Sequence, residues 1–127
     1  MTIAAFTPAP AARIEFDHHA LSALCARHGD GTEAYLARRL GEVEAGLARL
    51  DAAAGAADYR GIGRACDALS SLAREIGMVT LEHCAAAVTD CLEGADGTAL
   101  TACVARLLRL GEPESLSGWA VIGAPAA

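Results

Sequence analysis

The sequence of 127 residues contains no lysine, and its aromatic residues are limited to one Trp, two Tyr and two Phe. Apolar residues still make up 54% of the chain, so any core must consist mainly of Ala, Leu, Val, Ile and Cys. Because β-branched and aromatic residues are scarce, this composition favours closely packed helices over a sheet. The ten basic residues are all arginines, they are scattered, and the net charge is −6. A nucleic-acid partner would require clustered cations, so it is not expected.

Several other common signals are missing. The N-terminal region lacks the basic start and the continuous apolar stretch of a signal peptide, and no run approaches transmembrane length. The cysteines form no Cys-x-x-Cys pair and are odd in number, which favours reduced, buried thiols in a cytoplasmic protein. No Gly-rich phosphate loop is present, and no cofactor is predicted. The five cysteines are Cys25, Cys66, Cys84, Cys91 and Cys103.

The length is that of a single domain with one core. Residues 1–12, rich in Ala and Pro, are expected to form a flexible leader. Residues 13–111 are expected to form a helical bundle, and 112–127 a non-helical C-terminal tail. The tail contains the only Trp, Trp119, whose role the sequence leaves open.

Apolar residues recur at three-, four- and seven-residue spacing through most of the chain, which predicts amphipathic helices. A short helix is expected over 18–28, with Asp17 as its N-cap. Four longer helices are expected at about 32–54, 59–76, 80–94 and 98–110.

Polar residues and glycines mark the ends of these helices. Thr32 and Asp58 are the expected caps of the first two long helices, and Thr80 is expected to open the next one. Gly77 is expected to end the helix before it in a left-handed conformation. Consecutive amphipathic helices with short connections can bury their apolar stripes only against one another. We therefore predict an all-α, antiparallel four-helix bundle with a short extra N-terminal helix.

The most specific pattern is Asp-Ala-Leu-Ser-Ser-Leu-Ala-Arg-Glu-Ile-Gly at 67–77. It resembles the active-site box of histidine-containing phosphotransfer (HPt) domains, roughly His-x-Leu-Lys-Gly-small-small-x-x-Leu/Ile-Gly. Leu69, Ile76 and Gly77 occupy matching positions, and the run at 64–69 is similar to the family's Arg-Ala-Ala-His-x-Leu. The resemblance implies an HPt-like bundle in a bacterial two-component phosphorelay. Its partner would be a response-regulator receiver domain or a histidine kinase.

The chain departs from this box at the positions that carry the chemistry. Asp67 stands in the phosphoacceptor position of the histidine, Ser70 in that of the lysine and Ser71 in that of the glycine. A carboxylate is a poor nucleophile and would approach an acidic receiver pocket against like charge. Without the lysine, no cation offsets charge on the phosphoryl oxygens. We therefore predict no enzymatic phosphotransfer, and a pseudo-HPt that regulates its partner by occupancy.

Asp67 falls off the apolar stripe of its helix, among small and polar neighbours at three- and four-residue spacing. We predict that this exposed strip binds the partner. Mimicry of a phosphorylated histidine by Asp67 is less favoured, because a single carboxylate charge is a partial imitation. The protein is expected to be a monomer or a weak homodimer. The predicted partner-binding residues are Gly63, Arg64, Asp67, Ser70, Ser71 and Arg74.

Other functions remain as alternatives. An active phosphocarrier would need an unorthodox histidine. His83 lacks a following lysine or glycine, and His19 lacks the long helix that should precede a phosphorylated helix. A helical adaptor unrelated to phosphorelays is the remaining alternative.

Metal binding and cysteine chemistry are less favoured. One candidate metal group consists of His18, His19, His28 and Cys25. Three of these residues, His18, Cys25 and His28, could share part of one helix face, but nothing supplies a clear fourth ligand, and no metal site is predicted. Cys66 and Cys84 lie on or beside apolar stripes, without a cationic neighbour that would activate a thiol.

Overall fold

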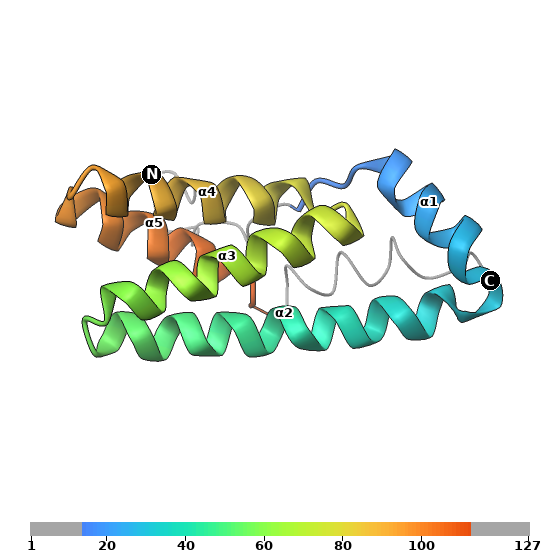
Figure 1. The fold of residues 1–127 in the computed structure, drawn as a ribbon, viewed down its shortest axis with the longest axis horizontal. Coiled ribbons are helices and arrows are strands. Elements are labelled where there is room, and N and C mark those ends of the chain that lie inside the picture. Colours follow the sequence, from blue (N-terminus) through green and yellow to red (C-terminus); the bar gives the residue numbers. More distant parts are fainter. Residues whose placement is uncertain (1–13, 113–127) are drawn as a thin grey trace, which may run out of the picture.

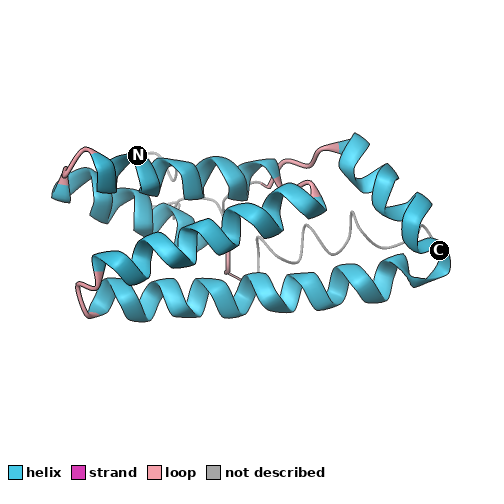
Figure 2. Ribbon diagram, viewed as in Figure 1, coloured by secondary structure: helices cyan, strands magenta, loops and turns pink. Residues whose placement is uncertain are grey.

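The computed structural model describes residues 14–112, and every regular element in that range is a helix (Figures 1 and 2). The only strand-like contact within it is an isolated bridge between Phe16 and Met78. Within this range, the prediction of an all-helical fold with one short and four longer helices is confirmed. The helices are α1 (His18–His28), α2 (Thr32–Gly55), α3 (Tyr59–Ile76), α4 (Val79–Glu93) and α5 (Gly97–Arg109). The predicted leader, and the predicted tail from residue 113 onward with Trp119, lie outside the described residues.

The four longer helices pack around a common core. Helix α3 packs against both α2 and α4, α5 packs against α4, and α5 also contacts α2. Helix α2 runs along one long side of the molecule, and α1 lies across its far end in contact with α2 and α3 (Figure 1). No helix in the described part of the chain is long and apolar enough to cross a membrane.

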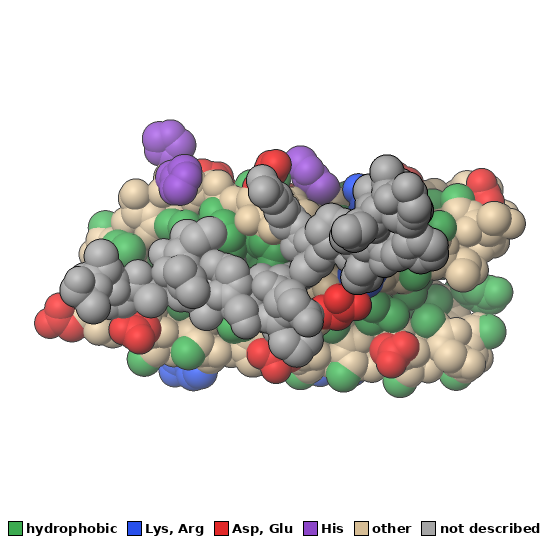
Figure 3. All heavy atoms as spheres, turned by 180° about the vertical axis from the view of Figure 1, so that it is seen from behind, with side chains coloured by type: hydrophobic (Ala, Val, Ile, Leu, Met, Phe, Trp, Pro, Cys, Tyr) green, Lys and Arg blue, Asp and Glu red, His purple; other side chains and the backbone are tan. Residues whose placement is uncertain are grey.

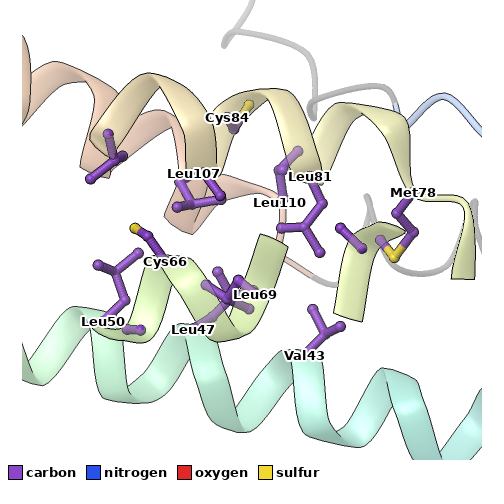
Figure 4. Packing of buried hydrophobic residues seen from close by; sticks show 14 of the residues in the cluster. Val43, Leu47, Leu50, Cys66, Leu69, Met78, Leu81, Cys84, Leu107 and Leu110 are labelled. Atoms are coloured by element: carbon purple, nitrogen blue, oxygen red, sulfur yellow. The ribbon is translucent and has the colours of Figure 1, made fainter. Parts of the chain in front are cut away.

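The core is built from the predicted apolar stripes. Leu69 of α3 is fully buried and points toward α2 beside Leu47 (Figure 4). A methyl group added to Gly46 of α2 would lie only 2.8 Å from Leu69 Cδ2, so α2 and α3 approach closely here. The larger fully buried side chains are Leu24, Leu50, Leu69, Ile76, Met78, Leu81, Leu107 and Leu110.

Two of the predicted caps are confirmed. The Asp17 carboxylate accepts a hydrogen bond from the backbone N–H of His19 at 2.9 Å, at the start of α1. The Asp58 carboxylate accepts one from Gly61 at 2.9 Å, at the start of α3. Both side chains satisfy backbone donors that lack a partner within the first helical turn.

Helix α2 begins at Thr32 as predicted, but the predicted cap at Thr32 is wrong, and the predicted start of α4 at Thr80 is one residue late. Thr32 is the first residue of α2, and its hydroxyl donates to the Gly29 carbonyl at 2.7 Å, because a short 3-10 turn (Gly29–Gly31) already leads into the helix. Helix α4 begins at Val79, and the Thr80 hydroxyl instead accepts from the Glu15 N–H at 2.7 Å. Helix α5 begins one residue earlier than expected, because Asp96 caps it.

Gly77 joins α3 to α4 and also anchors the segment before α1. Its φ of +75° lies in the left-handed region, as predicted. The Gly77 carbonyl accepts a hydrogen bond from the Asp17 N–H at 2.7 Å. A methyl group at Gly77 would lie 2.9 Å from the Asp17 carbonyl oxygen and 3.1 Å from Ala20 Cβ. Only glycine satisfies both the conformation and the close approach.

A polar cluster joins the opposite end of α1 to α2 and α3. The Tyr35 hydroxyl donates to the Glu75 carboxylate and accepts from Arg39 Nε at 3.0 Å. Arg39 Nε also lies 3.2 Å from a Glu75 oxygen, and the His28 ring stacks on Tyr35 with centroids 3.9 Å apart. Helix α1 is therefore held at both of its ends.

We expect Gly77→Ala to lower the free energy of unfolding by at least about 1–2 kcal/mol, the cost of a left-handed alanine before any clash. Chemical denaturation monitored by circular dichroism measures this change. Gly41→Ala is the matched control, because Gly41 is exposed within α2 and a methyl group there meets nothing within 4 Å. The control should be neutral or stabilising by up to about 1 kcal/mol. Equal stability of the two variants would contradict the assigned role of Gly77.

Candidate functional site

The predicted partner-binding residues share one face of α3. Asp67 is exposed in the middle of the helix, as predicted from its position off the apolar stripe. At 3.6 residues per turn, the predicted residues span an arc of about 120°. Arg64, Ser71 and Arg74 are exposed with Asp67, whereas Gly63 and Ser70 are half-buried. We call Gly63, Arg64, Asp67, Ser70, Ser71 and Arg74 the Asp67 face.

Burial of the opposite side of α3 determines where the Asp67 face points. Ile62, Cys66 and Leu69 are buried in the core, at three- and four-residue spacing. Figure 4 shows Cys66 and Leu69 directed inward between the helices. With this stripe inside and the helix ends set by Asp58 and Gly77, the Asp67 face is directed to solvent.

The charged residues of this face are Arg64, Asp67 and Arg74. The Asp67 carboxylate has no hydrogen-bond or ion-pair partner among residues 14–112. Arg74 Nε lies 3.0 Å from Glu82 Oε2 of α4, with 68% of the Arg74 side chain exposed. An ion pair so exposed contributes little stability, so a partner can displace it at small cost. Figure 3 shows the molecule from behind, on a different side, where the described residues that are visible include scattered acidic side chains and few arginines.

Some residues beside the Asp67 face were missed by the sequence reasoning. Arg60 is exposed within the same arc, one turn before Arg64, and this four-residue spacing was a signal available in the sequence. Glu82 belongs to α4, and its pairing with Arg74 has no signal in the sequence. Ala86 and Thr89 follow Glu82 at four- and three-residue spacing, so they extend the flank of α4 that borders α3.

The cysteines match the prediction only in part. Cys66 and Cys84 are buried, but Cys25 is exposed, and Cys91 and Cys103 are half-buried. The expectation of a buried Cys25 is wrong because α1 presents mainly Leu24 to the core, and the next residue is turned away from it.

Cys66 lies beneath the Asp67 face with 1% of its surface exposed. Burial, with a smaller contribution from the Asp67 charge, raises the pKa of the Cys66 thiol to about 11. The thiol therefore remains protonated near neutral pH, and the neutral form is a weak nucleophile. This environment does not suit a cysteine-dependent enzyme.

None of the four histidines belongs to the Asp67 face. His18, His19 and His83 are exposed, and His28 is half-buried against Tyr35. Within the described part of the chain, no group of three or more His, Cys, Asp or Glu side chains is arranged to hold a metal ion.

No protein-family model matches the chain, and comparisons with curated proteins and with solved structures give no significant match. The relation to HPt domains therefore stays a prediction that rests on the residues and the geometry described above.

The thiol environments predict an order of reactivity with an alkylating reagent under reducing conditions. Cys25 should react first, because it is exposed. Cys66 should stay unmodified in the folded protein at pH 8, since burial hides it and the thiolate is scarce at a pKa of about 11. Peptide mapping by mass spectrometry, with and without denaturant, measures the difference. Rapid alkylation of Cys66 in the folded state would contradict this assignment.

Proposed function

We propose that this chain is an HPt-like protein of a bacterial two-component phosphorelay that is degenerate at its phosphoacceptor position. It binds a receiver or histidine-kinase domain through the Asp67 face and regulates that partner by occupancy, in the cytoplasm. The observation that carries the proposal is the exposure of Asp67 in the middle of α3, at the histidine position of an HPt-like box.

Two contacts support an antiparallel bundle of the HPt type. Near the start of α3, a methyl group at Gly63 would lie 3.8 Å from Leu92, close to the end of α4. Near the end of α3, Arg74 pairs with Glu82, close to the start of α4. Short connections over 56–58, 77–78 and 94–96 and the contact of α5 with α2 fit the same arrangement.

Small residues around Asp67 favour close approach of a partner. Gly63, Ser70 and Ser71 add little side-chain bulk beside Asp67, between the exposed Arg64 and Arg74, and Ala86 is small and exposed on the neighbouring flank of α4. The serine hydroxyls can donate and accept hydrogen bonds, and the Asp67 carboxylate can accept them from a cationic side chain. Because Asp67 has no partner within the described chain, docking breaks no internal bond at the centre of the face.

The same face lacks the groups that phosphotransfer requires. None of its residues is a histidine, and the whole chain has no lysine. His83 is one residue beyond Glu82, about 100° farther around α4 and away from the flank that pairs with Arg74. Binding without transfer is therefore the activity that these residues favour.

We expect at least one receiver or histidine-kinase domain encoded by the same genome to bind this protein. Ser71→Arg places a long, charged side chain beside Asp67 and should weaken that binding at least tenfold, or about 1.4 kcal/mol. Ala105→Arg is the matched control, because Ala105 is exposed on α5 and outside the Asp67 face. Isothermal titration calorimetry measures the Kd of each variant. No binding by any such domain, or equal weakening by both substitutions, would contradict the proposal.

Restoring the phosphoacceptor box tests whether the scaffold still supports transfer. The triple variant Asp67→His, Ser70→Lys, Ser71→Gly should accept phosphoryl from a phosphorylated receiver, as acid-labile label on position 67. Ser70 is half-buried, so the new lysine must extend its amine to solvent along the helix surface. The glycine should cost at most about 1 kcal/mol of stability.

The unaltered protein is the control for this assay and should remain unlabelled. Acid-labile phosphate on its His83 or His19 would instead indicate an active phosphocarrier. If the triple variant is folded by circular dichroism but accepts phosphoryl from no receiver, a helical adaptor unrelated to phosphorelays becomes the better explanation.

A further inference from the structure

Two cysteines from neighbouring helices lie in contact at a site outside the Asp67 face. Cys91, near the end of α4, and Cys103, in the middle of α5, have their Sγ atoms 3.6 Å apart. Both residues are half-buried, and neither is in a disulfide. Among residues 14–112, no other pair of cysteine sulfurs is in hydrogen-bonding contact.

The two sulfurs need to move only a short distance to join. A disulfide requires an S–S distance near 2.05 Å, so from their separation of 3.6 Å the sulfurs must approach by about 1.5 Å. The site is also accessible to a small oxidant. Cys91 lines an open surface groove together with Tyr59, Asp96 and Leu100, and 62% of Tyr59 is exposed.

We propose that Cys91 and Cys103 form a dithiol modification site, which hydrogen peroxide converts into a disulfide between α4 and α5. One sulfur attacks the peroxide, the O–O bond breaks, and a sulfenic acid and one water form. The second thiol then attacks the sulfenic sulfur, the S–S bond forms, the S–O bond breaks and a second water leaves. Two electrons pass from the sulfurs to the peroxide. This proposal does not depend on the proposed function.

The surroundings of the pair make this a slow reaction. Partial burial, the Cys103 thiol, and the carboxylates of Asp96 and Asp90 all raise the pKa of the Cys91 thiol. Because the thiolate is the attacking species, the site responds to sustained rather than brief exposure to oxidant. Its selectivity comes from the neighbouring sulfur, which converts the first oxidation product to a disulfide before further oxidation.

The cross-link would tie together two helices that are joined by a short turn at 94–96. It closes a short loop in the unfolded chain and so lowers the entropy of the unfolded state. We expect oxidation to raise the Tm by at least about 5 °C. This is less than the full stabilisation that a disulfide closing a loop of this length is expected to give.

The test uses the full chain, reduced, freed of reductant and exposed to hydrogen peroxide. Peptide mapping under non-reducing conditions should show one intramolecular link between Cys91 and Cys103, with the loss of two hydrogen atoms per chain. Thiol reductant should reverse both the link and the rise in Tm. Cys91→Ala and Cys103→Ala should each abolish both effects, whereas Cys25→Ala, which removes an exposed cysteine, should retain them.

The mapping on the unaltered protein decides the question even if a variant fails to fold. Alkylation of both Cys91 and Cys103 after prolonged peroxide treatment would overturn the proposal. So would a dominant link that involves any other pair, or an equal rise in Tm in the Cys103→Ala variant.

Discussion

The close packing of α3 against α2 is the contact on which the rest of this structure depends. Leu69 fills the space beside Gly46, where a methyl group would come within 2.8 Å of it. This contact sets the rotation of α3 about its axis. With Leu69 and its neighbours at three- and four-residue spacing directed inward, Asp67 must lie outside. The packing of the core therefore determines which residues of α3 face solvent in the candidate site.

The exposed face of α3 combines a few charged side chains with small ones. A chain without lysine can offer cations only through arginine, and Arg74 already pairs with Glu82 at 3.0 Å. Gly63, Ser70 and Ser71, with the exposed Arg64, surround the Asp67 carboxylate, which has no partner among residues 14–112. We propose that phosphotransfer was lost while partner binding was retained, and the tolerance of exposed positions to substitution is consistent with this. Exposed residues on a helix can change at little cost in stability, whereas its buried stripe cannot.

The two proposed sites use different flanks of α4. Glu82 lies on the flank that meets α3, and Cys91, nine residues later, lies about half a turn around the helix. A disulfide between Cys91 and Cys103 would thus join α4 to α5 without covering the flank beside Asp67. Oxidation would hold α4 and α5 more rigidly together. It would leave the side chains of the proposed docking surface unchanged.

The sequence by itself determined the helices, their apolar stripes and the exposure of Asp67, because helical periodicity relates each residue to the axis of its own helix. Asp17, Asp58 and Gly77 were predictable because helix ends depend on nearby backbone groups. Only the tertiary structure decided the hydrogen bond from Glu15 to Thr80, the exposure of Cys25, the Arg74–Glu82 pair and the contact between Cys91 and Cys103. Each of these depends on which side of a neighbouring element a residue meets, and periodicity within one helix carries no information about its neighbour.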